Sequence, residues 1–463
     1  MSIRDLIVSV SYFVASFAFI LGIKQLSHPK TARRGNQIAA AAMMLAIVAT
    51  LVDKSIVSYW SIIIGTIVGG GIGVYFGRTV KMTAMPQLVA LFNGMGGGTA
   101  ALVSIAEFTK AANGEMTAGI AASVVLGAAI GAISFSGSII AFGKLQELLP
   151  ERPIRFPFQM QFNALLLIAT LSLGGLVVAG VSPTTALLVS ASLAAVLGVL
   201  VVLPIGGADM PVVISILNSC TGVAAALTGF VVHNQLLVVA GALVGASGTL
   251  LTFMMARAMN RPVSNVLFSG FGSVVQAVGK GGGAFNKLVK ETSADDAGVA
   301  LAYARTVVVI PGYGLAVAQA QQTVKELAEE LEHRGVNVKF AIHPVAGRMP
   351  GHMNVVLADA NIPYETLCEM DQINGEFDST DVTLVIGAND VVNPAARSDP
   401  SSPIYGMPIL NADHSRNVIV LKRSMSPGFA GIDNALFYND NTRMLFGDAK
   451  ASLGKLVAAV KLN

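Results

Sequence analysis

The sequence contains little charge. Charged residues make up 12% of the 463 residues, whereas hydrophobic residues make up 53%. Because soluble globular domains carry about 25% charged residues, this composition excludes an ordinary soluble protein, and it also excludes a disordered chain and a collagen. The net charge of only +3 does not indicate the basic surface that binds nucleic acid.

Cysteine is scarce as well. The two cysteines, Cys220 and Cys368, lie far apart and form no CxxC motif, which excludes a disulfide scaffold. We expect Cys220 to be a small apolar packing residue rather than a reactive thiol.

The charge that is present is divided unevenly along the chain. Residues 1–263 hold 14 Lys and Arg and 7 Asp and Glu, so 21 of the 57 charged residues, and the remaining 200 residues hold the other 36. This split predicts a polytopic α-helical membrane domain followed by a water-soluble domain. We place the membrane domain at 1–261, a linker with Gly281–Gly283 and a polar run at 262–300, and the second domain at 301–463.

Nine apolar stretches are long enough to span a bilayer, whose hydrocarbon core, about 30 Å thick, needs roughly 20 apolar residues per helix. They are residues 6–23, 36–53, 57–77, 84–106, 118–143, 161–180, 183–204, 211–231 and 234–256. The first has no basic leader and no cleavage site, so we expect it to remain as an anchor.

The basic residues between these spans indicate the orientation of the chain. One set of connections carries eleven: Lys24, Lys30, Arg33, Arg34, Arg78, Lys81, Lys144, Arg152, Arg155, Arg257 and Arg261. The other set carries only Arg4, Lys54 and Lys110. Because basic loops remain in the cytoplasm, this asymmetry places the N-terminus outside and residues 257–463 inside.

Glycines recur at helical spacing in two of the spans, at Gly65, Gly69, Gly73 and Gly77, and at Gly241 and Gly245. Small residues four positions apart let helix backbones approach closely in lipid. Two interpretations stay open, namely close packing within one subunit and a seam between subunits.

The second domain begins with the pattern of a βαβ unit. A β-branched strand at 306–310 is followed by Pro311, the turn Gly312-Tyr313-Gly314, a helix at about 318–334 and a second strand at 336–342. In such units the first two glycines allow a tight turn and the close approach of a pyrophosphate. The third fingerprint position is Val317 rather than glycine. The pattern predicts a Rossmann-like, doubly wound parallel sheet.

The basic residues of a later strand favour NADP over NAD. An NAD site places an acid near the end of the second strand, but this chain has His343-Pro344 there. The strand at 417–421 instead ends in Lys422-Arg423-Ser424, two cations and a hydroxyl that suit a 2′-phosphate. We therefore expect the dinucleotide to lie reversed. The alternative, a solvated basic strand end, stays open.

Three further segments have unusual loop chemistry. Polar residues at 387–394 follow the strand at 382–386, the segment 343–352 follows the second strand, and the flexible segment 426–431 could close over a ligand. Each alone is typical of a connection, but together they outline one cleft at the carboxyl ends of the strands.

In these segments the sequence resembles the β subunit of proton-translocating NAD(P) transhydrogenase, over essentially the whole chain. The most specific stretches are residues 309–314, 342–354, 385–396, 418–424 and, in the membrane, 204–211. The resemblance implies that the second domain binds NADP(H) and that NAD(H) binds to a separate α subunit. Hydride would pass directly between the two nicotinamides, coupled to proton movement, in a dimer of protomers in the bacterial inner membrane.

The resemblance also implies roles for individual residues. Gly312, Gly314 and Ala316 match the pyrophosphate turn; Lys422, Arg423 and Ser424 match the 2′-phosphate site; Asn389 and Asp390 lie near the nicotinamide; Arg348 contacts the cofactor; and Gly428, Phe429, Ala430 and Gly431 match a lid. The predicted cofactor site is completed by Tyr313, Val317, His343, Ala346, Gly347, Gly387 and Ala388. Asp390 is the candidate for a carboxylate whose protonation follows the redox state of the cofactor.

Four polar residues outline a proton route: Asn93, Ser138, Asp209 and Asn218. Asp209 also suits a helix N-cap before Pro211, and the other three could simply join helices. Some relatives carry an intramembrane histidine where this chain has Asn93, and an amide does not titrate. We therefore predict that a partner subunit supplies the ionisable group, and that Asn93 and Asn218 order water beside it.

A second functional class remains open, an ion transporter or channel whose cytosolic domain senses a dinucleotide. Such a protein places ionisable groups near mid-membrane, and the predicted spans contain none there. Neither hypothesis needs a metal or a nucleophilic side chain, because the cofactors carry the chemistry.

Overall fold

The computed structural model describes residues 3–26, 28–52, 59–111, 116–150, 153–260, 262–268, 289–402, 404–428 and 430–463. The chain forms two compact units, which we call the membrane unit (Met1–Gly206 and Val213–Thr252) and the sheet unit (Gly207–Val212 and Phe253–Asn463). The predicted Gly281–Gly283 lies outside the described residues, and the described ends of the predicted linker form α10 (Val263–Phe268) and most of α11 (Ala294–Ala302).

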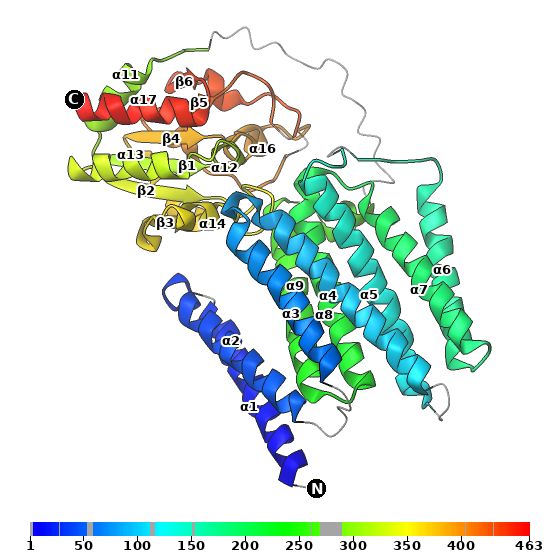
Figure 1. Cartoon of the computed structure of the whole chain (residues 1–463). Helices are drawn as coiled ribbons and strands as arrows, with labels where there is room; N and C mark the ends of the chain where they lie inside the picture. Colours follow the sequence, from blue (N-terminus) through cyan, green and yellow to red (C-terminus); the bar gives the residue numbers. More distant parts are fainter. Residues whose placement is uncertain are drawn as a thin grey trace. The chain divides into compact units, whose positions relative to one another are not determined.

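The described residues include nine helices long and apolar enough to span a bilayer, as predicted. They are α1 (Ile3–Leu26), α2 (Pro29–Leu51), α3 (Trp60–Thr79), α4 (Met85–Ala111), α5 (Ala118–Leu145), α6 (Gln159–Val178), α7 (Pro183–Val202), α8 (Met210–Val231) and α9 (Gln235–Ala258). Within the membrane unit α1 packs on α2, α4 and α7 pack on α5, and α6 packs on α7 (Figure 1).

Glycine has different consequences in two parts of the membrane unit. On α8 and α9, a Cβ at Gly222 would lie 2.3 Å from Gly245 N, and one at Gly241 would lie 2.4 Å from Ala226 N, so these backbones touch. On α3, a Cβ at Gly65, or at the three other glycines of its stripe, would meet nothing within 4 Å in the described chain. Close packing within the subunit thus accounts for Gly241 and Gly245 but not for the α3 stripe.

The sheet unit contains six parallel strands in the order β3-β2-β1-β4-β5-β6. They are β1 (Thr306–Pro311), β2 (Asn337–Ile342), β3 (Leu367–Glu369), β4 (Val382–Ile386), β5 (Asn417–Lys422) and β6 (Thr442–Phe446). This order is that of a doubly wound dinucleotide-binding sheet, with its switch point between β1 and β4, so the predicted fold class is confirmed.

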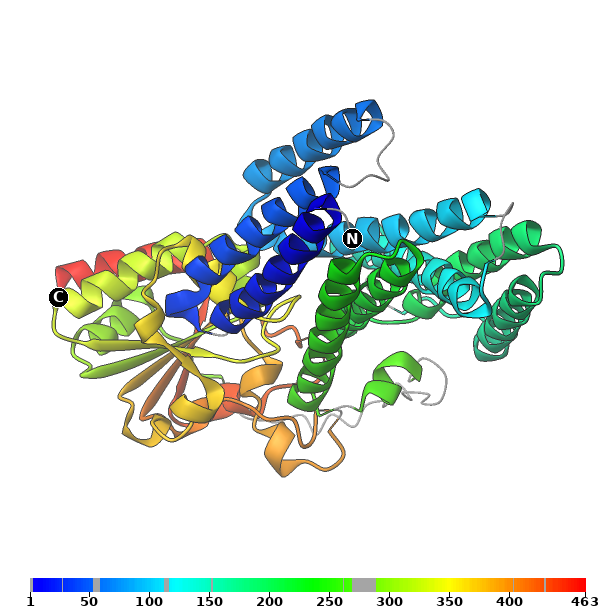
Figure 2. The same ribbon diagram turned by 90° about the horizontal axis from the view of Figure 1, so that it is seen from below.

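Two layers cover the sheet (Figure 2). On one face lie α11, α12 (Tyr313–Val317), α13 (Gln321–His333), α14 (His352–Asp359) and α17 (Ala449–Leu462). The other face buries side chains of shorter elements, among them α15 (Met370–Ile373). Strand residues alternate between the layers; Val307 and Val309 of β1 face the first, and Val308 and Ile310 face the second.

The helix predicted at about 318–334 is α13, and it is preceded by a separate short helix, α12, that the sequence did not predict. Gln319 has a φ of +50°, a left-handed conformation that ends the short α12, and α13 begins only at Gln321. The interruption lets Ala320 N bond Leu315 O and buries Leu315 completely.

A carboxylate joins three strands at the amino edge of the sheet. Asp381 Oδ2 accepts hydrogen bonds from Arg305 N at 2.9 Å and Thr306 N at 3.2 Å, and Asp381 Oδ1 accepts one from Arg416 Nη1 at 2.9 Å. Burial works against ionisation, but these N–H donors and the guanidinium groups of Arg305 and Arg416 hold the pKa of Asp381 below its usual value. Asp381 therefore fixes β1, β4 and β5 at the edge away from their carboxyl ends.

Candidate functional site

The glycine turn after β1 interlocks with the turn after β4. Gly312 N donates to Ile386 O at 2.8 Å and Gly314 N donates to Gly387 O at 3.0 Å. A Cβ at Gly312 would lie 2.4 Å from Gly387 O, and Gly387 itself has a φ of +64°. The glycines that the sequence assigned to a pyrophosphate turn are thus required by contact between two backbones at the switch point.

Arg348 lies against the glycine turn. Its guanidinium group is 4.4 Å from the centre of the Tyr313 ring, a cation–π contact. Its backbone N donates to His352 Nδ1 at 3.0 Å, and Gly347, with a φ of +112°, leaves no space for a Cβ beside His352. The segment after β2 therefore folds back and brings together Arg348 and Tyr313, two residues of the predicted cofactor site.

His343 is a buried, neutral connector, 2% exposed. Its Nδ1 accepts from Val345 N at 3.2 Å, so Nε2 carries the proton and donates to Pro408 O at 2.8 Å. Burial lowers the pKa of His343 to about 4, although the bond to Pro408 opposes this shift. The imidazole is therefore uncharged at neutral pH and ties the end of β2 to the segment before β5.

The predicted lid lies directly on Asn389 and Asp390. Ala430 N donates to Asp390 Oδ2 at 2.9 Å, and a Cβ at Gly428 would lie 2.6 Å from Asp390 Oδ1 and 2.7 Å from Asn389 Nδ2. A side chain at this position would force Asn389 and Asp390 to shift. Phe429, the remaining lid residue of the predicted site, lies outside the described residues.

Asn434 holds Asn389 in one orientation, and sequence reasoning missed it. Asn434 is 1% exposed; its Nδ2 donates to Asn389 O and to Asn389 Oδ1, both at 3.0 Å, and its Oδ1 accepts from Leu436 N at 3.0 Å. These bonds leave Asn389 Nδ2 as a buried donor without a partner in the described chain. An asparagine in an irregular segment carries no periodic signal, so the sequence offered no indication of this role.

The basic end of β5 is arranged by partners from three segments. Lys422 Nζ donates to Ser426 O and lies 5.5 Å from the Phe437 ring, and Arg423 forms a 3.5 Å ion pair with Asp448. Burial lowers the pKa of Lys422, while the carboxylates of Asp390 and Asp433 oppose this shift.

Ser424 and Arg423 complete the basic strand end. Ser424 Oγ lies 2.9 Å from Ser426 Oγ. The Arg423 side chain is 67% exposed and available to a ligand. Its partner Asp448, which caps α17 through its other oxygen, was not predicted, because it contacts Arg423 across 25 residues of chain.

The described residues of the predicted cofactor site follow the carboxyl ends of β1, β2, β4 and β5. Ala346 and Ala388 are buried, Ala316 lies beneath the glycine turn, and Val317 is 50% exposed at the end of α12. A glycine cradle, a buried amide donor and two cations along one sheet edge suit a phosphorylated dinucleotide. The described residues contain no group of His, Cys, Asp or Glu that could hold a metal.

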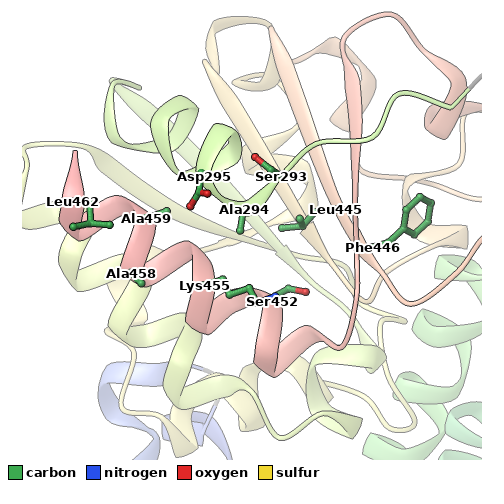
Figure 3. Close-up of a pocket in the computed structure, with 10 residues that line it drawn as sticks. All are labelled: Ser293, Ala294, Asp295, Leu445, Phe446, Ser452, Lys455, Ala458, Ala459 and Leu462. Carbon is green, nitrogen blue, oxygen red and sulfur yellow. The ribbon is translucent and has the colours of Figure 1, made fainter.

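A separate groove of about 540 Å³ lies between α11 and α17 (Figure 3). Ser293, Asp295 and Lys455 supply its polar groups, and Leu445 and Leu462 part of its apolar wall. None of its lining residues belongs to the predicted cofactor site.

The membrane unit contains a polar cluster that joins α4, α5 and α8. Asn93 Nδ2 donates to Ser138 Oγ at 2.9 Å. Ser134 Oγ donates to Leu217 O at 2.9 Å and lies 2.6 Å from Thr221 Oγ1. The structure thus brings the predicted Asn93 and Ser138 together and adds Ser134 and Thr221, which the sequence did not single out.

The two other residues of the predicted proton route lie elsewhere. Asn218 is half-buried on α8 and belongs to none of the hydrogen bonds of this cluster. Asp209 is buried, 9% exposed, in the 3₁₀ turn Gly207–Asp209 just before α8.

Lys144 corrects one expectation. The sequence places it in a connection just after the fifth span, but α5 extends to Leu145 and Lys144 is 1% exposed. Its Nζ donates to Leu203 O at 2.5 Å and to Ile205 O at 2.7 Å. The long aliphatic side chain packs inside the bundle while carbonyl oxygens satisfy the ammonium group.

Comparison with known proteins identifies the family. The family model described as NAD(P) transhydrogenase beta subunit matches residues 8–459. Two proteins named NAD(P) transhydrogenase subunit beta, both from Rhodospirillum rubrum, are each 48% identical over 458 residues, which cover 97% of this chain and 98% of theirs. The chain therefore belongs to the NAD(P) transhydrogenase beta subunit family.

Proposed function

We propose that the chain is the NADP(H)-binding and proton-translocating half of a transhydrogenase. Residues 301–463 bind NADP(H), residues 1–261 conduct protons, and 262–300 link them. Hydride passes directly from NADH on a partner α subunit to NADP⁺. The observation that carries the proposal is the set of groups at one sheet edge, where Lys422 and Arg423 end β5 and Asn389 and Asp390 follow β4 beneath Gly428.

The positions of the strands support a reversed dinucleotide. In the usual orientation an acid at the end of β2 holds the adenosine ribose, but here β2 ends in Ile342 and the neutral His343. The cations lie at the end of β5, on the other side of β1. Lys422, Arg423 and Ser424 would hold the 2′-phosphate, and the nicotinamide would lie toward Asn389 and Asp390.

The protein's own part in hydride transfer is binding, orientation and exclusion of water. Bound NADP(H) supplies the redox chemistry. Asn389, fixed by Asn434, offers its Nδ2 as a donor to the ligand, and Gly428 with Ala430 covers Asp390. Asp390 is the candidate carboxylate whose protonation follows the redox state of the cofactor.

The proton route runs past the polar cluster of the membrane unit. Asn93, Ser134, Ser138 and Thr221 are neutral, so they order water while an ionisable group comes from the partner subunit. Asn218 and Asp209 complete the route on α8 and just before it. By the charge of the connections, the NADP(H) domain faces the cytoplasm of a bacterium, in a complex with α subunits that dimerises.

Hydride transfer by the assembled complex tests the proposal. The purified chain together with its α partner should reduce an NADP analogue with NADH, and the chain alone should not. Proton uptake into inverted vesicles should accompany the reverse reaction, from NADPH to an NAD analogue, because proton entry into the cytoplasm drives the forward reaction. An ion flux that responds to NADP in the absence of hydride transfer would instead establish the dinucleotide-sensing transporter.

A further inference from the structure

Lys144 is a buried cation that the proposed reaction does not use. It lies one residue before the end of α5, and its ammonium group donates to two backbone carbonyls, Leu203 O and Ile205 O. Among the described residues it forms no ion pair with a carboxylate. Ionisable side chains inside a membrane bundle are costly and are retained mainly where they serve a function.

The two carbonyls belong to the turn between α7 and α8. Leu203 O also accepts from Ile154 N at 3.3 Å, and Ile205 N donates to Val202 O at 3.1 Å. A lysine near a helix C-terminus is favourable because it meets carbonyl oxygens that have no partner within the helix. Lys144 therefore fixes the place where α7 ends.

The fixed turn is also the point at which the chain leaves the membrane unit. Gly206 is the last residue of that stretch, and the next six residues, Gly207–Val212, belong to the sheet unit. They include Asp209 and the first residues of α8. The turn held by Lys144 is thus followed directly along the chain by the segment with Asp209.

The same helix holds α8 at a second place. Ser134 of α5 donates to Leu217 O of α8 within the polar cluster, and Lys144 lies ten residues, or about 15 Å, farther along α5 at 1.5 Å per residue. A displacement of α5 relative to α8 would therefore disturb both the polar cluster and the turn before α8.

We propose that Lys144 is a positioning residue for coupled proton translocation, which holds the turn before Asp209 in register with the polar cluster. The inference rests on the proposed function. A buried ammonium group that loses both carbonyls is left without partners, which is strongly unfavourable. The turn is consequently held to α5 by these two hydrogen bonds.

The test compares three variants of Lys144 in the complete complex with the α partner, in inverted vesicles. Lys144→Met removes the charge and both hydrogen bonds, Lys144→Gln keeps a donor, and Lys144→Arg keeps the charge. Lys24→Met is the control, because Lys24 is an exposed lysine in the last turn of α1. Proton uptake is measured beside hydride exchange between bound NADP(H) and an NAD analogue, which needs only the nucleotide sites.

Lys144→Met should lower proton uptake per hydride by at least about tenfold and leave hydride exchange within about twofold of the parent. Lys144→Arg should restore most of the uptake, and Lys24→Met should change neither rate. Full coupling in Lys144→Met, or equal loss of both rates in an assembled complex, would overturn the positioning role. If the complex with Lys144→Met does not assemble, the Lys144→Gln variant tests the proposal in its place. Normal proton uptake by the Lys144→Gln complex would overturn the positioning role. A parent complex without hydride transfer would refute the proposed function instead, whatever the variants do.

Discussion

The two units satisfy their polar groups with different chemistry. In the sheet unit, charged groups meet opposite charges; Arg397 Nη2 lies 2.6 Å from both oxygens of Asp413, and Lys339 lies 2.5 Å from Glu376. In the described part of the membrane unit, buried polar contacts join hydroxyls, amides and carbonyls, as at Ser134 and at Ser104 with Thr228. Even Lys144 is satisfied by carbonyl oxygens.

The difference indicates how each unit can respond to a change in charge, such as a bound phosphate or a proton. A nucleotide phosphate can exchange with an existing ion pair, such as that of Arg423 with Asp448. A bundle held by neutral hydrogen bonds responds to a proton only through a group that titrates. The substitution of any single neutral residue in the bundle should therefore have a small effect. Substitutions of charged residues at the sheet edge should accordingly have larger effects than substitutions of neutral residues in the bundle.

The largest effect is expected from the double substitution Lys422→Ala with Arg423→Ala. Each charge-assisted hydrogen bond contributes roughly 1.5–3 kcal/mol, so NADP(H) affinity should fall by about a hundredfold or more, with little change for NAD(H). Titration calorimetry of both nucleotides measures the ratio. Lys455→Ala, an exposed cation on α17, is the control, and an unchanged preference for the phosphorylated coenzyme would remove the basis of the proposed site.

Asn434→Asp tests a neutral group within the sheet unit. Aspartate has no donor for the two oxygens of Asn389, so the Asn389 amide should rotate and its Nδ2 should turn toward residue 434. The loss of one oriented donor, roughly 1–2 kcal/mol, should slow hydride transfer about tenfold. Steady-state rates measure the effect, and Asn439→Asp adds the same charge nearby as a control. A wild-type rate in Asn434→Asp would show that the amide orientation is irrelevant.

Asp381→Asn should weaken the amino edge of the sheet without affecting nucleotide binding. The folded-state pKa of Asp381 is lowered, so its stabilisation is present above the unfolded pKa, near 3.9, and is lost as pH falls through the lower folded value. At neutral pH, the amide protons of Arg305 and Thr306 should exchange faster by an amount that corresponds to about 1 kcal/mol. Equal exchange in variant and parent at pH 7 would contradict the assigned role.

Asn93→Leu should have the smallest effect if the bundle depends on many neutral contacts. One interhelical hydrogen bond in a membrane contributes about 0.6 kcal/mol, which corresponds to roughly a threefold change, here in coupled proton uptake. Hydride exchange between bound nucleotides should not change. Normal coupled uptake would reject the water-ordering role of Asn93, and complete loss would show that this amide carries more of the route than its neighbours.

Most of the architecture was predictable because it depends on periodic or compositional signals. The nine spans follow from apolar length, and the strands from β-branched runs such as Val307–Val309. The break at Gln319 was not predictable, because Leu315 is buried by its tertiary setting rather than by local preference. The burial of Lys144 was not predictable for a related reason, because its carbonyl partners come from the turn between α7 and α8.

The candidate site was predictable to the extent that its chemistry lies at strand ends. Lys422 ends β5 and Arg423 follows it, and Asn389 and Asp390 lie in the turn after β4. Their supporting partners, such as Asn434, come from irregular segments, and only the folded chain brings them to the strands. The sequence therefore singled out the groups of the proposed ligand site but not the groups that hold them in place.

The carboxylate of Asp381 stabilises the edge of the sheet at the amino ends of the strands, whereas the candidate site lies at the opposite edge, at their carboxyl ends. Because three strands are pinned at their amino ends, their carboxyl ends can change sequence or conformation without unravelling the ladder. Variants selected for a different coenzyme can accordingly alter side chains in the turns after β1, β4 and β5, provided that the pinned edge and the contacting glycines Gly312 and Gly387 are left untouched.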